Sequence, residues 1–252
     1  MKTKLPTTID EVLDVLAIII QETEENNDTL GYFASVYRKV TVKVKEEIAN
    51  NYFDDGERMA KLDVVFANRY IDAYYDFKEN KTITQSWLQA FQISTNYWPI
   101  VLQHLLLGMN AHINLDLGIA AAHISKNKNI DDLEGDFNKI NEILSSLVGE
   151  IQNDLSEIWP KLKWILSKVD SMDDFLVDFS MKIARDGAWK FAKSIANLPK
   201  DQLSARIDLR DKKVSKKVTL IIRPELLAKI IFGIIRISER GSVTEKIIKL
   251  KI

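Results

Sequence analysis

Cysteine is absent from the 252-residue sequence, and proline (5) and glycine (9) are scarce. Without cysteine the chain can form neither a disulfide framework nor a cysteine-based zinc site, and it fits a reducing compartment. Few glycines and prolines disfavour β-rich folds, which depend on tight turns. The 35 basic and 36 acidic residues give a net charge of −1, so no global field attracts nucleic acid or acidic lipid. We therefore expect no nucleic-acid partner.

Motifs of several enzyme classes are missing as well. The sequence has no glycine-rich phosphate loop, no Gly-x-Ser-x-Gly motif and no Cys/His nucleophile pattern. The N-terminal stretch MKTKLPTTIDEVLDVLAIIIQ is partly apolar, but Asp10, Glu11 and Asp14 interrupt it, which is atypical of a signal peptide. A helix capped by Thr8, with Glu11 completing a capping box, explains it better. We expect a cytoplasmic location.

Apolar residues recur at three- and four-residue spacing through most of the chain, which predicts an all-α fold. We expect helices over about residues 8–25, 30–50, a third ending near 77, a short one around Trp87, then 99–125, 132–158, 172–198 and a last region restarting at Pro224. Residues 210–223 fit a helix or a strand. One domain over residues 1–252 is the simplest account. Residues 200–252 form a basic, apolar C-terminal extension, which we expect to pack on the bundle. Its end, from Leu226 onward, should cover the helix that holds Phe175 and Trp189.

The segment from Thr82 to Ser125 contains a single charged residue, Asp116. A helix that is apolar almost all round belongs in the centre of a bundle, so we predict a multi-helix bundle around one buried central helix of about residues 99–125. A membrane span is the competing interpretation, because the length would suffice. The strongly polar residues within the segment argue against it, since each would be costly in lipid. We expect no transmembrane segment.

When the central segment is wound at about 100° per residue, its polar residues form two stripes. One stripe contains Gly108 together with His104, His112, Asp116 and His123. The opposite stripe contains Gln103, Asn110 and Asn114. Buried polar groups need hydrogen-bond partners, so we expect neighbouring helices on both sides. Gly108 would leave room beside His104 and His112 for a side chain, a water molecule or a ligand, and His123 is expected to be solvated.

The spacing of His112 and Asp116, one helical turn, lets both side chains reach one proton, water molecule or metal ion. His104 precedes His112 by eight residues, about 12 Å along the helix axis, which is too far for both to ligate one ion. A divalent metal at His112 and Asp116 would therefore need carboxylates from other helices. Such a ligand set favours magnesium or manganese over zinc.

The stretch LQHLLLGMNAHINLDLGIA resembles the signature of the bacterial helical proteins grouped as domain of unknown function family 5995. The similarity extends to YFASVYRKVT, LDVVFANRYIDAYY and SWLQAF, with weaker matches at DFNKINEIL and ARDGAW. It covers roughly residues 30–200. The resemblance implies a shared helical fold and a shared site position, whereas the activity of the family is unassigned.

The same motifs contain polar residues at apolar helix positions. Arg69 shares a helix face with Leu62 and Phe66, and arginine is rarely buried without an acidic partner. Asp72 flanks this face, and Asp116 on the central helix is the natural cross-helix partner of Arg69. Asp186 falls among Phe175, Phe179 and Ile183, again an acid on an apolar face. A purely structural salt bridge is the alternative for Arg69 and Asp186.

The leading hypothesis is an enzyme or small-ligand-binding protein with a buried His/Asp/Asn/Arg pocket. In an enzyme His112 would be the general base, oriented by Asp116, with His104 as a third catalytic candidate, and the reaction would be hydrolysis or proton transfer. Arg69 could hold an anionic group of a small ligand. The ligand-binding candidates are Arg69, Asp72, Asn110, Asn114 and Asp186.

The competing hypothesis is a non-catalytic helical scaffold or binding protein whose buried polar residues only specify packing. The C-terminal segment could also bind a membrane surface or form a homo-oligomer.

Overall fold

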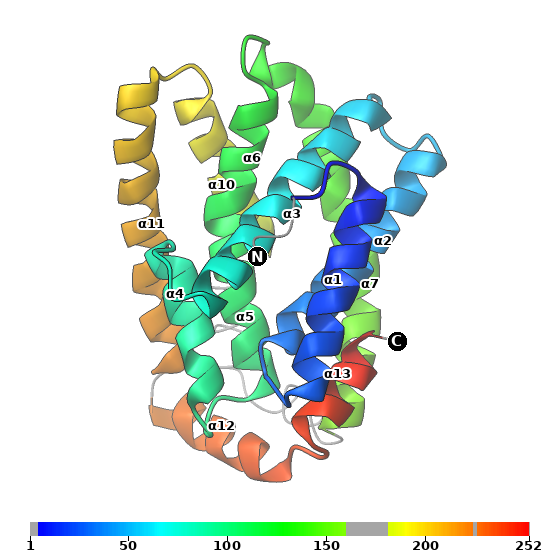
Figure 1. The fold of residues 1–252 in the computed structure, drawn as a ribbon, viewed down its shortest axis with the longest axis vertical. Coiled ribbons are helices and arrows are strands. Elements are labelled where there is room, and N and C mark those ends of the chain that lie inside the picture. Colours follow the sequence, from blue (N-terminus) through cyan, green and yellow to red (C-terminus); the bar gives the residue numbers. More distant parts are fainter. Residues whose placement is uncertain (1–4, 160–180, 224–225, 252) are drawn as a thin grey trace.

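The computed structural model describes residues 5–159, 181–223 and 226–251, and all secondary structure within these ranges is helical (Figure 1). The elements are α1 (Ile9–Glu25), α2 (Gly31–Ala49), α3 (Gly56–Lys78), α4 (Gln85–Gln92), η1 (Ile93–Thr95), α5 (Val101–Ala111), η2 (His112–Asp116), α6 (Leu117–Ile124), η3 (Ile130–Leu133), α7 (Glu134–Ile158), α10 (Met181–Ile195), α11 (Lys200–Ile222), α12 (Leu226–Ser238) and α13 (Val243–Lys251). The predicted all-α fold is confirmed. The ambiguous stretch 210–223 is helical through Ile222, within α11.

The elements α5, η2 and α6 form one continuous helix, Val101–Ile124, at the centre of the bundle (Figure 1). It packs against α2, α3, α4, α10 and α11. By length and composition this helix could cross a membrane, but 89% of its most apolar window is buried by the rest of the protein. Burial of that kind is what the core helix of a bundle shows. The predicted central helix is therefore present.

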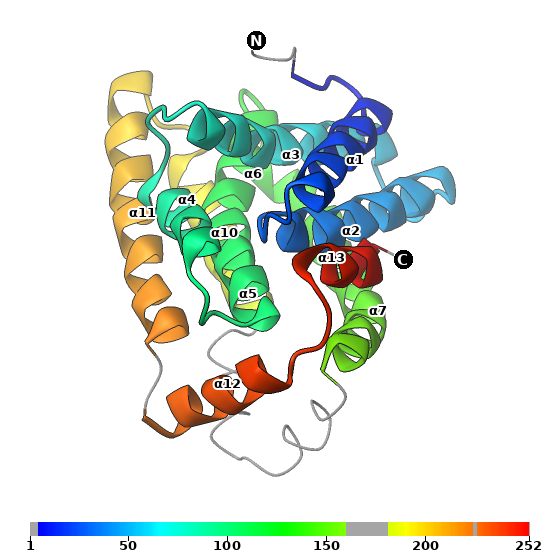
Figure 2. The same cartoon turned by 60° about the horizontal axis from the view of Figure 1, so that its bottom comes forward.

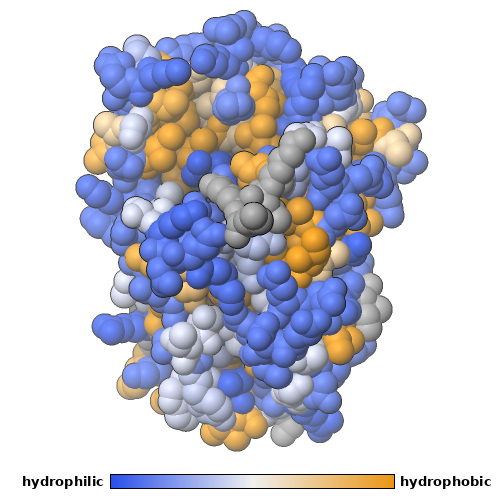
Figure 3. All heavy atoms as spheres, viewed as in Figure 1, coloured by the Kyte–Doolittle hydropathy of each residue, from blue (hydrophilic) through white to orange (hydrophobic). Residues whose placement is uncertain are grey.

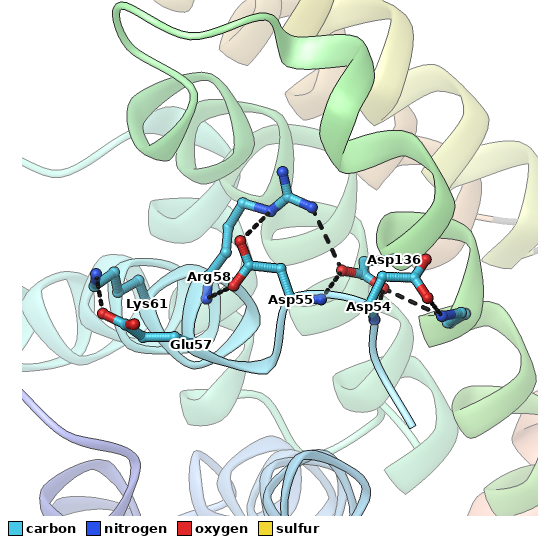
Figure 4. Close-up of polar contacts among 7 residues, drawn as sticks. Asp54, Asp55, Glu57, Arg58, Lys61 and Asp136 are labelled. Carbon is cyan, nitrogen blue, oxygen red and sulfur yellow. Dashed lines mark hydrogen bonds and ion pairs between the residues drawn. The ribbon is translucent and has the colours of Figure 1, made fainter. Parts of the chain in front are cut away.

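Two helices begin at a carboxylate supplied by another part of the chain. Asp136 of α7 accepts hydrogen bonds from the backbone N–H groups of Asp54 (2.7 Å) and Asp55 (2.9 Å), just before α3, and Arg58 lies beside it (Figure 4). Asp55 in turn caps α3 by accepting from the N–H of Arg58. Likewise Asp211 of α11 accepts from the N–H groups of Gln85 and Ser86 at the start of α4. These acids satisfy N–H groups that a helix cannot satisfy itself, and they join distant segments.

Asparagine ends several helices in this glycine-poor chain. Asn27, Asn51, Asn80 and Asn127 have positive φ angles of 50° to 63°, and each lies just beyond a helix end. Asparagine tolerates this left-handed conformation better than other non-glycine residues, so it can reverse the chain where glycine is usual. Asparagine therefore allows short connections between helices in a chain that has few glycines.

The C-terminal helices lie across one end of the bundle (Figure 2). Helix α13 packs on α1, α2 and α7 and buries Ile247 and Leu250. The expectation that α12 and α13 cover the helix that holds Phe175 and Trp189 stays a prediction, because Phe175 lies outside the described residues. Helix α12 buries Ile231, Phe232 and Ile235 on one face. Its other face exposes Leu226, Ile230, Ile234 and Ile237.

Candidate functional site

Asp116 is the centre of a buried polar network. Its side chain has no exposed surface and lies at the end of η2, a π-helical turn in the middle of the central helix. The Nε of Arg69 donates to Oδ1 at 2.9 Å, and the Nε1 of Trp87 donates to Oδ2 at 2.7 Å. The Nδ1 of His112 lies 3.4 Å from the same Oδ2. The predicted cross-helix pair of Arg69 and Asp116 is confirmed.

The electrostatics of this network keep Asp116 ionised and His112 neutral. Burial raises the pKa of Asp116, but the Arg69 charge and the hydrogen bonds from His112 and Trp87 outweigh it and hold the pKa below its usual value. Burial lowers the pKa of His112, and the Asp116 carboxylate only partly opposes that effect. A neutral His112 that donates from Nδ1 to Asp116 carries its lone pair on Nε2.

The imidazole of His112 is enclosed by aromatic rings. It stacks on Phe66 with 3.6 Å between ring centroids and meets the edge of Tyr37 at 4.5 Å. Its Nε2 is buried and has no hydrogen-bond partner within the described residues. An unpaired buried nitrogen costs free energy, about 1–3 kcal/mol for a neutral group. That atom is therefore the best candidate for an interaction with a bound molecule.

His112 lines a predominantly apolar cavity of about 380 Å³ between α2, α3, α5, α7 and α10. Most of its wall is aliphatic and aromatic, for example Val36, Val40, Leu106 and Leu155. The polar residues among the described residues of the wall are Tyr37, Asp63, His112, Gln152 and Arg185. A mostly apolar cavity with a few polar groups is the usual form of a small-molecule site.

A second, polar cavity of about 590 Å³ lies on the other side of Asp116. Arg69 and Trp87, which both bind Asp116, line it, and the predicted ligand residue Asp72 is there too. Asp208, Asp211 and Lys212 of α11 complete the wall. Asp116 thus links a polar cavity, through Arg69, with an apolar cavity, through His112.

Comparison with known families accounts for most of the chain. The model of the Family of unknown function (DUF5995) matches residues 9–224. The chain belongs to this family. No curated protein and no solved structure matches the sequence. The DUF5995 match includes α1 to α11 and the whole Asp116 network, and it ends before α12.

In this DUF5995 chain His104 lies apart from His112 and Asp116. It is buried against Tyr32, with 5.5 Å between the ring centroids, and lines neither cavity. Burial, reinforced by the charges of Arg236 and Lys246, lowers its pKa to about 3. The structure therefore does not bring His104 into contact with the other two catalytic candidates.

The opposite stripe of the central helix faces α11. Asn110 donates to the Val214 carbonyl at 3.1 Å, and Asn114 donates to the Asn110 side chain at 3.2 Å. Gln103 donates to the Ile221 carbonyl at 2.7 Å. The expectation of partners on both sides of the helix is confirmed. These contacts cross-link two helices and place Asn110 and Asn114 outside both cavities.

On α10 the predicted orientation was wrong. Asp186 is exposed, as is Ile183, whereas Arg185 is buried. The Nη2 of Arg185 donates to the Phe137 carbonyl at 2.6 Å, and its guanidinium lies 5.0 Å from the centre of the Phe137 ring. The buried charge of this helix is thus the residue before Asp186. The other predicted neighbours, Phe175 and Phe179, lie outside the described residues.

Two smaller expectations have clear outcomes. His123 is exposed, as predicted. The room expected beside Gly108 is taken by a side chain, because a Cβ built there would lie 2.4 Å from Cδ2 of Phe33. Of the three alternatives, a side chain, a water molecule or a ligand, the first is confirmed.

The residues around Asp116 do not fit a metal ion. Both carboxylate oxygens already accept hydrogen bonds, and the adjacent Arg69 guanidinium repels a cation. The described residues contain no cluster of three or more His, Asp or Glu side chains that could hold a metal. The proposed chemistry below therefore uses His112 and Asp116 without a metal.

Two members of the apolar cavity wall were missed by sequence reasoning. Asp63 of α3 is buried, and Tyr37 of α2 contacts His112. Both lie in stretches that carry the family resemblance. Asp63 could have been noticed, because it falls between Met59 and Phe66 on the core face of α3.

Proposed function

We propose that this protein binds a mostly apolar small molecule in the 380 Å³ cavity and that the Nε2 of His112 accepts a hydrogen bond from it. The observation that carries the proposal is the buried, unpartnered Nε2 of a histidine that lines this cavity. A purely structural histidine would be expected to use both ring nitrogens. The apolar walls supply affinity, and His112 supplies orientation.

The same arrangement supports acid–base catalysis. His112 would take a proton at Nε2 from the bound molecule, and Asp116 would fix the ring and stabilise the resulting imidazolium. Arg69 and Trp87 hold Asp116 in place and keep it ionised. In this assignment Arg69 orients the network from the polar cavity, instead of holding an anionic ligand as its sequence position suggested.

The scaffold hypothesis fits other residues better. Gln103, Asn110 and Asn114 all make hydrogen bonds within the protein, so their burial is explained by helix packing. His112 differs because its buried Nε2 has no hydrogen-bond partner among the described residues.

Fluorescence titration with 1-aminoanthracene, an apolar probe with a donor amine, tests the binding proposal. We expect saturable binding to the wild type and its loss in Val40→Trp, which fills the cavity. Ile18→Trp, on the exposed surface of α1, is the matched control and should bind as the wild type does. Equal binding by Val40→Trp and wild type, with both variants folded by circular dichroism, would reject the cavity as the site.

A further inference from the structure

Asp63 is a second unusual polar group in the apolar cavity. Its carboxyl group is buried, and Oδ2 has no hydrogen-bond partner within the described residues. It lies one helical turn before Phe66, the ring on which His112 stacks, so it is separated from that contact by about 4.5 Å along α3. Tyr37 lines the same cavity as Asp63 and His112, and its ring centre lies 4.5 Å from that of His112.

The hydrogen-bonding roles of the two groups are opposite. Burial raises the pKa of Asp63 to about 7, so a large share of the molecules carry a protonated, donating carboxyl at neutral pH. Burial lowers the pKa of His112, whose Nε2 is therefore an acceptor. The cavity lining thus offers a donor and an acceptor that have no hydrogen-bond partner among the described residues.

We propose that Asp63 is the second polar contact of this cavity and that the ligand is an uncharged, mostly apolar molecule with a hydroxyl or carbonyl oxygen. Asp63 donates to that oxygen, and His112 accepts from a hydroxyl. A charged ligand is disfavoured because most of the wall is apolar, and a charge removed from water into such surroundings costs much more than a neutral oxygen that is hydrogen-bonded. This inference rests on the proposed function.

Among the described residues, the other titratable or charged groups in or beside the cavity do not change charge near neutral pH. They are Tyr37, His112, Asp116 and Arg185. Burial raises the pKa of Tyr37 and lowers that of Arg185 to about 10, and the pKa values of His112 and Asp116 are lowered. Asp63 alone is therefore expected to ionise between about pH 6 and pH 8.5. Ionisation removes the donor, so binding of an oxygen-containing ligand should weaken as the pH rises.

The experiment compares four probes that share an eight-carbon chain: 1-octanol, 2-octanone, n-octane and octanoate. Binding to the full-length protein is followed by saturation-transfer NMR and calorimetry at about pH 6 and pH 8.5, which lie on either side of the Asp63 pKa. We expect 1-octanol and 2-octanone to bind more tightly at the lower pH and n-octane to bind equally at both. Asp63→Leu should weaken 1-octanol about tenfold without weakening n-octane, as expected for the loss of one buried hydrogen bond.

Two further variants keep the result interpretable. Asp63→Asn retains a donor that does not titrate, so it should bind 1-octanol with no pH dependence in this range. Asp14→Asn, an exposed acid on α1, should behave as the wild type does.

The outcomes separate the two proposals. If 1-octanol and n-octane bind with equal affinity, and Val40→Trp abolishes both, the cavity proposal stands and the role of Asp63 is rejected. Octanoate binding as tightly as 1-octanol at the higher pH rejects the uncharged ligand class and points to Arg185. Failure of every probe to bind the folded wild type rejects both proposals.

Discussion

At the scale of single residues, Asp116 joins three other side chains in one buried polar network. It is fully buried, and Arg69, Trp87 and His112 all contact its two oxygens. A buried carboxylate is tolerated only when it is paired and hydrogen-bonded, so each partner depends on the others. The residue therefore serves both the stability of the bundle and the orientation of His112.

Asp116→Asn should destabilise the protein by about 2–4 kcal/mol. Removal of one member of a buried pair costs about 3–5 kcal/mol, and the estimate is reduced because the Arg69 side chain is 32% exposed. Urea unfolding measures the change. Glu57→Gln is the control, since the Glu57–Lys61 pair is exposed and its loss should leave the unfolding midpoint unchanged. Equal midpoints for Asp116→Asn and wild type would contradict the network.

His104 should make the protein sensitive to acid. Its pKa is about 3 in the folded protein against an ordinary 6.5, so below pH 6.5 the unfolded state gains a proton that the folded state does not. Stability falls as the pH decreases from 6.5, by about 2 kcal/mol between pH 6.5 and pH 5 for one proton. Asp63 acts in the opposite direction, because its raised pKa makes the folded state the better proton binder between its ordinary 3.8 and about 7.

The variant His104→Gln isolates the histidine contribution. Its unfolding free energy, measured by urea titration at several pH values, should fall less between pH 6.5 and pH 5 than that of the wild type, by about 2 kcal/mol. Parallel pH profiles for the two proteins would show that His104 is protonated in the folded state.

At the scale of elements, the close packing of α2 on α5 explains why residue 108 is a glycine. The buried ring of Phe33 occupies the space where a side chain of residue 108 would be, and the same ring meets the edges of Trp87 and His112. A helix interior otherwise favours alanine over glycine. Glycine at this position is therefore explained by packing.

Gly108→Ala should destabilise the protein by about 1–3 kcal/mol, because a Cβ 2.4 Å from Phe33 forces the ring to move. Gly149→Ala on α7 is the matched comparison. No atom lies within 4 Å of its added Cβ, so this variant should gain about 0.5–1 kcal/mol from helix propensity. Opposite signs in chemical denaturation are expected, and a stabilising Gly108→Ala would refute the close contact.

At the scale of the whole molecule, the C-terminal helices are tied to the bundle by polar as well as apolar contacts. Glu239 is nearly buried, pairs with Lys246 at 2.9 Å and accepts from the N–H of Val101 at the start of the central helix. Thr244 donates to the Glu24 carbonyl at 2.7 Å. The region beyond the DUF5995 match is thus connected to the helix that carries His112.

Truncation after Arg223 should lower the melting temperature and the solubility, because it exposes the surfaces that α12 and α13 cover. Ile247→Ala, at a fully buried position, is a milder test and should cost about 2–4 kcal/mol. Differential scanning calorimetry measures both. A truncated protein that stays soluble with an unchanged melting temperature would show that these helices do not stabilise the bundle.

Self-association through the exposed face of α12 remains a prediction, which light scattering of Ile234→Lys and wild type would test.

The sequence was sufficient for the fold and for the pairing of Arg69 with Asp116, because both follow from helical periodicity and the rule that buried charges need partners. It was insufficient for the cavity. Asp63, Tyr37 and His112 line one cavity through the relative rotation of α2, α3 and the central helix, which no single-helix pattern specifies. On α10 we expected Asp186 on the buried face, whereas the structure has Arg185 there. The error was one residue, and a change of one position rotates a helix face by about 100°.

The π-helical turn His112–Asp116 also has a consequence for chain length. A turn of this kind holds one residue more than an α-helical turn, so it is equivalent to an insertion accommodated without breaking the helix. Upstream of it α5 aligns Gln103 with α11, and downstream α6 aligns its small residues with α10. Because the extra residue is taken up within this turn, the two halves keep their relative facing, whereas ordinary α-helical winding of the same residues would turn one half relative to the other by about 100°. The π-helical turn therefore lets the two halves of the central helix face their separate neighbours at a length that a regular α-helix would not allow.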